Sequence, residues 1–384
     1  MRAAPVPVQR PSDAKLLIVD PRGQISHRAR SEFPHILHPG DVVIANDAAT
    51  LPASLFGQHR PSGRRVEVRL AGRESLAEVR RFSAVLFGEG DFRLRTEDRP
   101  KPPLLHPDDR LELGPLRAMV VQLLHHPRLV SLQFDGPLRE IWEGLARHGR
   151  PIQYAHVAVP LALWDTWAPI ASLPVAFEPP SAGFVLDWSV LASMKARGIR
   201  FGTITHTAGI SSTGEAELDA LLPLPEPYRI PSSTAQIIKD AQEQRRRIIA
   251  IGTTVVRALE HSASLFDGIV LAGERLATQR MGPSSQVRVV DAILTGTHEP
   301  GSSHHELLRA FVDDGTLSHI DQELNAQNYR THEFGDSILI ERSHGKGVAA
   351  ASPKSALPSY RLMKCRNVAC RASRSHVPAS FILS

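Results

Sequence analysis

Short apolar runs separated by turn residues open the chain. Residues 16–19 form one such run, residues 20–23 read Asp-Pro-Arg-Gly, and residues 24–28 alternate, which predicts a β-hairpin. The next run, residues 42–45, is continuously apolar and predicts a buried strand that ends at Asn46 and Asp47. We expect this strand end to present polar groups.

Six β-type segments follow between about residues 57 and 135, separated by Gly, Pro and Asp turns. Their spacing is near the roughly 8 to 12 residues that are typical of a small barrel or sandwich. The segments are residues 66–70, 82–87, 92–95, 111–113, 119–124 and 129–134. We therefore predict an all-β, barrel-like insert over residues 58–137.

Helical and strand patterns then alternate, which favours an α/β layer architecture with a largely parallel sheet. The segments are residues 138–148, 188–197, 199–205, 233–244, 247–251, 253–261 and 302–312. Two long loops, residues 176–183 and 208–231, interrupt them, and long loops inside a domain are often functional. The predicted fold class is α/β, with a main catalytic domain over residues 11–57 and 138–341 that the barrel-like insert interrupts.

Composition supports a globular protein, because 42% of the 384 residues are hydrophobic and 22% are charged. No apolar run approaches the roughly 20 residues of a membrane span, so we expect no membrane association. The N-terminus shows no recognisable secretory signal. Two cysteines cannot form a disulfide framework, and both observations favour a cytoplasmic location.

The basic balance of the chain lies in its last part. Residues 342–384 hold eight Lys and Arg, no Asp or Glu, and both cysteines, and we expect a disordered tail there. Residues 1–341 then carry 37 basic and 40 acidic residues. The pI of about 9.5 is therefore no evidence that the folded part binds RNA through its bulk charge.

The best local signal for a ligand site is the strand 248–251, which enters a helix through Gly252, Thr253 and Thr254. Glycine permits close backbone approach and Thr can cap a helix, so this helix start could bind a phosphate or a carboxylate. Arg257 and Glu260 are three residues apart and can pair or face a ligand together. The alternative is an ordinary capped helix with a surface ion pair.

Three further polar residues lie at predicted element ends. His298 precedes a helix for which Ser303 and Glu306 predict a capping box, and it could act as a general acid or base. His206 follows the strand 199–205, and Asp336 precedes an apolar run. We expect a site where Asn46, Asp47, His206, Thr254, His298 and Asp336 converge. For His298 alone, an exposed loop histidine is an equal alternative.

Common cofactor motifs are missing from the sequence. There is no GxGxxG that opens a helix, no P-loop, no HExxH and no GxSxG. Cys365 and Cys370, with His376, do not have zinc-site spacing. We therefore predict no metal site and no nucleotide cofactor.

The motifs, read in order, resemble those of the S-adenosylmethionine:tRNA ribosyltransferase-isomerase family of queuosine biosynthesis. The resemblance covers about residues 17–340, and its strongest segment is GTTVVRALE at residues 252–260, similar to the family's VGTTxxRxLE. The other similar segments are HPGD at 38–41, ND at 46–47, LPASLFG at 51–57, VEV at 66–68, PSAG at 180–183, TH at 205–206, EPY at 226–228, TGTHEPGS at 295–302 and FGDSILI at 334–340.

The resemblance implies an enzyme that moves the ribosyl part of S-adenosylmethionine onto the 7-aminomethyl-7-deazaguanine base at the wobble position of tRNA. Adenine and methionine leave, and the product is epoxyqueuosine-tRNA. The partners would be S-adenosylmethionine and tRNA, with no cofactor besides that substrate, and we expect a monomer. The family's fold is likewise an α/β domain with a barrel-like module set into it.

Roles for individual residues follow from the resemblance as hypotheses. His206 or His298 would be the base, the turn at residues 252–254 with Arg257 would hold the methionine carboxylate, and Asp336 or Glu260 would contact an amine or the target base. The remaining substrate-binding candidates at motif positions are Asn46, Asp47, Gly183 and Tyr228.

The sequence also departs from the family pattern. Ala48 and Ala49 replace the Thr and Arg of NDTR, and Val185 and Leu224 replace two histidines. Gly296 and Gly301 replace an asparagine and a lysine. Two alternative functions therefore stay open. The chain could be a divergent paralogue that binds S-adenosylmethionine with another acceptor, or a non-catalytic RNA-binding protein.

Overall fold

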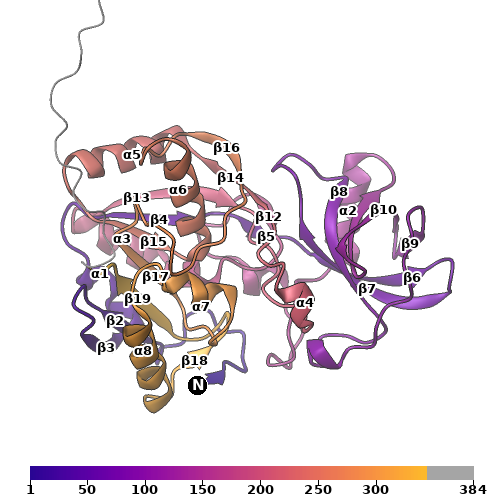
Figure 1. The fold of residues 1–384 in the computed structure, drawn as a ribbon, viewed down its shortest axis with the longest axis horizontal. Helices are drawn as coiled ribbons and strands as arrows, with labels where there is room; N and C mark the ends of the chain where they lie inside the picture. Colours follow the sequence, from indigo (N-terminus) through magenta and orange to yellow (C-terminus); the bar gives the residue numbers. More distant parts are fainter. Residues whose placement is uncertain (344–384) are drawn as a thin grey trace, which may run out of the picture. The chain divides into compact units, whose positions relative to one another are not determined.

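A mixed nine-stranded sheet is the main element of the computed structural model, which describes residues 1–343 (Figure 1). The order across the sheet is β16 (Gly273–Ala277), β14 (Glu226–Ile230), β13 (Arg200–His206), β4 (Val42–Asn46), β15 (Ile248–Ile251), β17 (Ala292–Gly296), β19 (Ser337–Glu341), β2 (Lys15–Val19) and β3 (Ile25–Ala29). The neighbours β13, β4, β15 and β17 run parallel. β16–β14, β14–β13, β17–β19 and β2–β3 are antiparallel pairs. The predicted α/β class is confirmed, but the sheet is parallel mainly at its centre.

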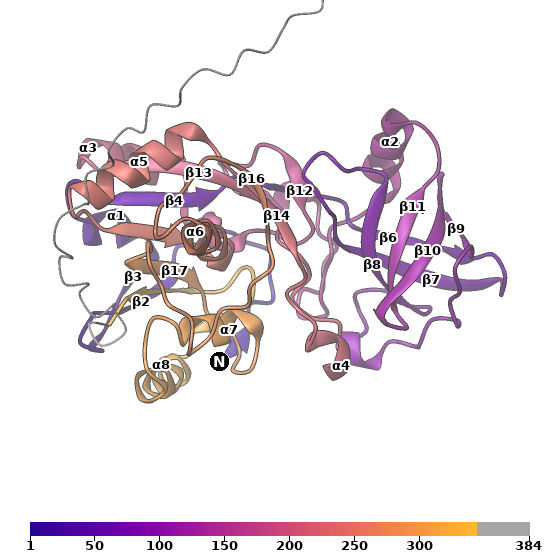
Figure 2. The same cartoon turned by 45° about the horizontal axis from the view of Figure 1, so that its top comes forward.

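Helices cover both faces of the sheet, which explains the continuous apolar runs of its central strands. The helices near the sheet are α1 (Phe33–Ile36), α3 (Trp188–Ala196), α5 (Ser232–Glu243), α6 (Thr253–Leu265), α7 (Ser303–Leu308) and α8 (Asp314–Ala326), whereas α2 (Leu138–His148) and α4 (Ala216–Asp219) pack in the core of the barrel described below. In β15, Ile248 and Ala250 pack in the core with α5, α6 and α8, whereas Ile249 and Ile251 pack with α1 and α3. Figure 2 shows α3 and α6 on either side of the sheet.

Six antiparallel strands close into a barrel in the middle of the sequence. The order around the barrel is β10 (Leu116–His126), β11 (Leu129–Phe134), β8 (Arg81–Phe87), β7 (Arg64–Gly72), β6 (Ser54–His59) and β9 (Arg110–Leu113). Ile141 and Leu145 of α2 pack in the same apolar core as these strands. The barrel thus begins at Ser54, before the predicted residue 58, and α2, after residue 137, packs on it. The division into domains stays a prediction, because residues 1–343 belong to one compact unit.

Two short strands mark where the chain leaves the sheet for the barrel and returns. β5 (Ala49–Thr50) precedes the first barrel strand and pairs in parallel with β12 (Pro174–Ala176), which follows the barrel. A second small pair joins β1 (Arg2–Ala3) to β18 (Arg330–Thr331). The β5–β12 pair is next to the loop 176–183 that the sequence singled out, so that loop begins where the two parts meet.

Most local predictions are confirmed and three are wrong. The hairpin is the antiparallel pair of β2 and β3, and the strand at residues 42–45 is β4. Residues 92–95 form no strand, because the carboxylate of Asp91 accepts a hydrogen bond from the Arg93 amide and closes a turn instead. β14 lies within the predicted loop 208–231. α7 is capped by Ser302, one residue before the predicted capping box, and ends at Leu308.

The predicted basic tail lies outside the described residues except for its first two. Arg342 hydrogen-bonds the carbonyl oxygen of Val287 at 2.7 Å and a carboxylate oxygen of Asp291 at 3.0 Å. Among residues 1–343, no helix is both long and apolar enough to span a membrane.

Candidate active site

A cavity of about 360 Å³ opens at the carboxyl ends of β15 and β17. Ligands of α/β proteins collect at this edge of a sheet, beyond the strand ends. The cavity is lined by Ile251 of β15 and Thr295 of β17, and by Gly252, Thr253 and Thr254 at the start of α6. Charged and histidine side chains that also line it are Glu178, Glu226, Arg257, Arg280, His298 and His304. The cavity is therefore built around the strongest motif of the sequence.

The turn from β15 into α6 requires a glycine. Gly252 has a φ of 96°, a backbone conformation that favours glycine, and its amide donates to the carbonyl oxygen of Leu294 at 2.7 Å. A Cβ atom on Gly252 would lie 3.3 Å from the Cβ of Ala182. Thr253 and Thr254 begin the helix and line the cavity. The first-turn amides of α6 lack partners within the helix, so they can receive an anionic group there.

Arg257 pairs with Glu226 and not with Glu260, which corrects the pairing that the sequence suggested. Its Nη1 donates to the Glu226 carboxylate, and its Nη2 lies 3.4 Å from the Ala277 carbonyl oxygen. Both charged side chains are buried. Burial, reinforced by the charge of Arg280, lowers the pKa of Arg257 to about 10, so the guanidinium stays charged at neutral pH.

Glu260 does not line the cavity and has a backbone-binding role. Its carboxylate accepts hydrogen bonds from the amides of Arg288 at 2.6 Å and of Val289 and Val290 at 2.9 Å each. Burial raises the pKa of Glu260, and these three bonds oppose the rise. The residue thus holds the segment 288–290 against α6, and its contact with a substrate stays a prediction.

Asn46 joins three of the segments that the sequence expected to converge. Its Oδ1 accepts the His206 amide at 2.9 Å, and its Nδ2 donates to the His206 carbonyl oxygen at 3.0 Å and to the Thr254 hydroxyl at 3.3 Å. Asp47 accepts the Thr205 hydroxyl at 2.7 Å. The ends of β4 and β13 are therefore fixed to each other and to α6, behind the cavity wall.

His206 lies behind Glu226 and is fully buried. Its Nε2 is 3.6 Å from Oε2 of Glu226, and neither ring nitrogen has a hydrogen-bond partner within residues 1–343. Burial, together with the charge of Arg257, holds the pKa of His206 well below its usual value, so the ring is neutral. The ring stacks on Tyr228, whose hydroxyl lies 2.9 Å from Nδ1 of His261. Neither His206 nor Tyr228 lines the cavity.

Two histidines from the loop and helix after β17 do line the cavity. Nε2 of His298 is 3.0 Å from the hydroxyl of Thr295, and its ring meets that of His304 edge-on, with 4.7 Å between the centroids. Burial, and then the charges of the neighbouring histidines, hold the pKa of His298 well below its usual value. Burial and the charge of Arg257 lower the pKa of His304 to about 4. Both rings are therefore neutral at physiological pH.

Glu178 is the acidic group with the most unusual ionisation in the cavity. Its side chain is buried, and the Tyr154 hydroxyl donates a hydrogen bond to it. Burial raises the pKa of Glu178 to about 7, with a further contribution from the charge of Glu333. A carboxyl group that titrates near neutral pH inside a cavity is suited to general acid–base chemistry.

Asp336 and Gly183 are not brought to this cavity. The Asp336 carboxylate accepts the amides of Lys15 at 2.9 Å and Arg330 at 2.7 Å, and it pairs with the Arg330 guanidinium. It therefore ties β2, β18 and β19 together. Gly183 is buried next to the wall residue Ala182. The catalytic role of Asp336 stays a prediction.

Five of the predicted residues, Gly252, Thr253, Thr254, Arg257 and His298, line the cavity. Sequence reasoning missed Glu178, Glu226 and His304 as site residues. Glu178 and Glu226 lie in the two long loops that were noted as functional candidates. Loop length therefore indicated the two segments but not which residues within them form the site. His304 is one of two adjacent histidines, and the pair gave no signal because it matched no metal-binding spacing.

Comparison with known proteins places the chain among named relatives. The family described as "Queuosine biosynthesis protein" matches residues 1–340. The S-adenosylmethionine:tRNA ribosyltransferase-isomerase of Sorangium cellulosum is 30% identical over 361 residues, which cover 87% of this chain and 94% of that protein. The protein of the same name from Thermus thermophilus is 30% identical over 338 residues, covering 85% and 92%.

One solved structure is also similar. It is the crystal structure of S-adenosylmethionine tRNA ribosyltransferase from Thermotoga maritima, which is 22% identical in sequence and has a TM-score of 0.47. The match covers 88% of this chain and 96% of that chain.

Proposed function

The chain belongs to the family of queuosine biosynthesis proteins, the S-adenosylmethionine:tRNA ribosyltransferase-isomerases, and we propose that it performs the reaction of that name. In that reaction, the ribosyl part of S-adenosylmethionine is transferred to the 7-aminomethyl-7-deazaguanine base at the tRNA wobble position and isomerised. Adenine and methionine are released, and epoxyqueuosine-tRNA is formed. S-adenosylmethionine is the substrate, and the proposal requires no further cofactor.

The observation that carries this proposal is the cavity at the start of α6. Its size of about 360 Å³ is within the range of small-molecule sites, roughly 300 to 1,000 Å³. Thr253 and Thr254 offer helix amides to the methionine carboxylate of the substrate. The carboxylates of Glu178 and Glu226 lie in the same wall and favour the positive sulfonium and ammonium groups. The cavity thus offers donors for an anion and carboxylates for a cation.

Arg257 enters the proposal as a positioning residue. Its guanidinium is engaged by Glu226 and by backbone carbonyl oxygens, so it orients the Glu226 carboxylate toward the cavity. This differs from the sequence hypothesis, in which Arg257 held the methionine carboxylate directly. The helix amides take that role in the present proposal.

The chemistry needs one base near the ribose C5′ carbon. The neighbouring sulfonium makes a C5′ hydrogen acidic, so the C–H bond breaks, its electron pair stays on carbon, and the proton passes to the base. His206 lies behind the wall, and the pKa of His298 is held well below neutrality. We assign the proton to the carboxylate of Glu178, whose raised pKa matches the operating pH. His298 remains next to the reacting groups as a neutral hydrogen-bonding partner.

Adenine release is the decisive measurement. The purified full-length protein, given saturating S-adenosylmethionine and tRNA that carries the aminomethyl-deazaguanine base, is expected to release adenine in step with tRNA modification. Glu178→Gln is expected to lower the rate by about 100-fold or more, the usual contribution of a general base. A shift in melting temperature with S-adenosylmethionine should persist in that variant.

The same measurements separate the alternatives. A ligand-induced rise in melting temperature without adenine release would identify a paralogue with a different acceptor. Salt-dependent tRNA binding that S-adenosylmethionine does not affect would identify an RNA-binding protein without this activity. Either result would overturn the proposed reaction.

A further inference from the structure

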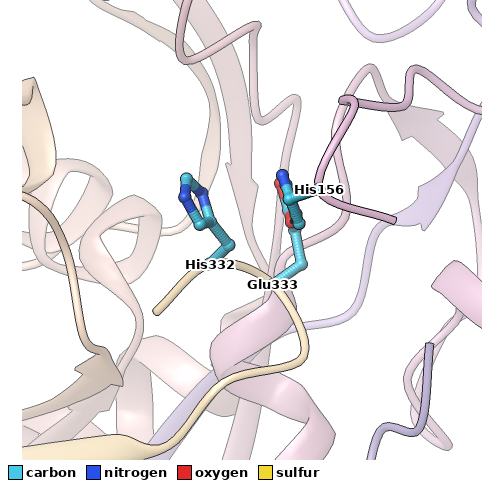
Figure 3. Close-up of side chains that lie close together, drawn as sticks. All are labelled: His156, His332 and Glu333. Carbon is cyan, nitrogen blue, oxygen red and sulfur yellow. Dashed lines mark hydrogen bonds and ion pairs between the residues drawn. The ribbon is translucent and has the colours of Figure 1, made fainter. Parts of the chain in front are cut away.

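Two histidines and a glutamate that the sequence did not single out meet in the fold. They are His156, in the loop after α2, and His332 and Glu333, in the turn between β18 and β19 (Figure 3). Each side chain offers one potential metal-ligand atom, and these three atoms all lie within 4.8 Å of one another. Nε2 of His156 is 3.1 Å from Oε2 of Glu333, and the two imidazole rings stack with 4.2 Å between their centroids. All three side chains are half-buried.

These side chains line a second cavity of about 500 Å³. His298 and His304 belong to the wall of this cavity and also to the wall of the first one. The cluster is therefore accessible to a small ion or molecule, and it lines a cavity that shares His298 and His304 with the first one.

The backbone presents His332 and Glu333 in a fixed turn. His332 has a φ of 69°, which is unusual for a residue other than glycine, and its carbonyl oxygen accepts the Gly335 amide at 3.0 Å. The turn is closed by the Asp336 carboxylate, which holds the amide of Arg330 at 2.7 Å. A side chain held in this conformation by its surroundings is a frequent feature of functional sites.

The loop that carries His156 is held just as firmly. Nε2 of Gln153 donates to the carbonyl oxygens of Val157 and Val159, at 2.7 Å each. The Tyr154 hydroxyl lies 3.1 Å from the carbonyl oxygen of Ser212. The three side chains thus come from two separately anchored segments, and their meeting does not depend on a mobile arm.

We propose that His156, His332 and Glu333 bind a divalent transition-metal ion of the zinc type. Two imidazoles and one carboxylate form a known set of three protein ligands for zinc, which leaves a position for water or another ligand. Imidazole ligands select such ions over magnesium and calcium, which prefer oxygen. In a tetrahedral zinc site, neighbouring ligand atoms are about 3.3 Å apart. The ligand atoms of the three side chains lie within 4.8 Å of one another, and the stacked rings have to turn before their nitrogens face one ion.

Glu299 completes the arrangement next to His332. Its Oε1 lies 3.5 Å from Nε2 of His332. A carboxylate beside a liganding imidazole fixes the orientation of the ring and increases its basicity. Two imidazoles and two carboxylates thus lie together at this place.

Metal binding can be tested directly and without measuring enzyme activity. The full chain is prepared with Cys365→Ser and Cys370→Ser, so that tail thiolates do not contribute, and is stripped of metal with a chelator. Titration with Co²⁺ is expected to give visible absorption bands that saturate at one equivalent, and Zn²⁺ should displace the Co²⁺ whereas Mg²⁺ should not. Zn²⁺ should also raise the melting temperature.

Variants locate the site. His156→Ala, His332→Ala and Glu333→Gln are each expected to weaken Zn²⁺ binding by more than about 100-fold, and Glu299→Gln by about 10-fold or more. His319→Ala, which removes an exposed histidine from α8, is the matched control and should bind normally. Circular dichroism of each metal-free variant checks that it folds. Failure to bind one equivalent, or equal affinity in folded ligand variants and the control, would overturn the proposal.

Discussion

At the scale of single residues, the two buried glutamates that line the first cavity, Glu178 and Glu226, have different neighbours. Glu226 has a cationic partner in Arg257, whose pKa of about 10 keeps the guanidinium charged at neutral pH. Glu178 instead receives a hydrogen bond from the neutral hydroxyl of Tyr154 and has the carboxylate of Glu333 as a charged neighbour. Burial therefore outweighs the hydrogen bonds that Glu178 accepts and raises its pKa to about 7. The two carboxyl groups of the cavity thus have different electrostatic surroundings.

This difference predicts the pH dependence of adenine release. The base form of Glu178 is the carboxylate, and with a pKa of about 7 its population grows as the pH rises from 6 to 8. The rate at saturating substrate should rise about tenfold per pH unit below that pKa and level off above it. Rates of the wild type and of Glu178→Gln, measured between pH 5.5 and 8.5, check this. A rise of the same size at the same pH in the Gln variant would show that another group titrates.

The same group affects stability with the opposite sign. Because the pKa of Glu178 is raised in the folded protein, folding favours its protonated form, and this contribution is lost as the pH rises from the usual carboxyl value toward 7. Urea unfolding of the wild type should therefore show a larger loss of stability between pH 5 and pH 8 than unfolding of Glu178→Gln. This readout needs no substrate, so it tests the ionisation separately from the reaction.

At the scale of elements, the barrel closes where β6 meets β9, and this contact depends on a glycine. Gln58 and His59 pair with Glu112 and Leu111 across the two strands. A Cβ atom on Gly57 would lie 1.9 Å from the carbonyl oxygen of Glu112, far inside van der Waals contact. Only a residue without a side chain allows the strands to approach there.

Gly57→Ala is therefore expected to destabilise the protein. The strands must separate to admit the methyl group, at a cost of about 1 to 3 kcal/mol or more in the free energy of unfolding. Urea unfolding measures the change. Gly282→Ala is the control, because a Cβ at Gly282 meets no atom within 4 Å, and its stability should be unchanged or slightly higher. Equal stability of the two variants would contradict the close approach of β6 and β9.

At the scale of the whole molecule, charge is distributed unevenly along the sequence. Residues 342–384 contain eight Lys and Arg and no acidic residue, whereas residues 1–341 contain slightly more acidic than basic residues. Contacts between cations and phosphates make nucleic-acid binding dependent on salt. The bulk charge of residues 1–341 therefore provides little general attraction for tRNA.

Removal of residues 344–384 should weaken tRNA binding and make it less dependent on salt. The slope of log K against log salt should fall by about 0.9 for each phosphate contact that is lost. Affinities of the full and shortened chains, measured between about 50 and 200 mM salt, give this slope. The melting temperature is the control for the fold, and a full-length variant with the seven Lys and Arg of residues 344–384 changed to Gln should match the shortened chain. An unchanged slope would assign tRNA contacts to local clusters such as Arg245, Arg246 and Arg247.

The sequence could predict those parts of the fold that depend on local patterns. Period and turn residues located β2, β3 and β4, and five strands of the barrel. Phe92 to Arg95 was predicted wrongly because the Asp91 turn is a side-chain interaction that apolar alternation does not reveal. β14 was missed because its pattern lies in a segment rich in proline, and its place in the sheet depends on pairing with β13 and β16.

What the sequence determined by itself was the chemistry-bearing turn at Gly252 and the order of motifs that identifies the family, because both are local in the chain. Only the tertiary structure decided which side chains and backbone groups these residues contact. Arg257 meets Glu226, 31 residues away, and Glu260 is used by backbone amides. His156 and Glu333 are 177 residues apart and become neighbours only when the loop after α2 reaches the turn before β19. Burial of Glu178, and with it a pKa near neutrality, likewise exists only in the folded chain, since the shift comes from desolvation and not from residue type.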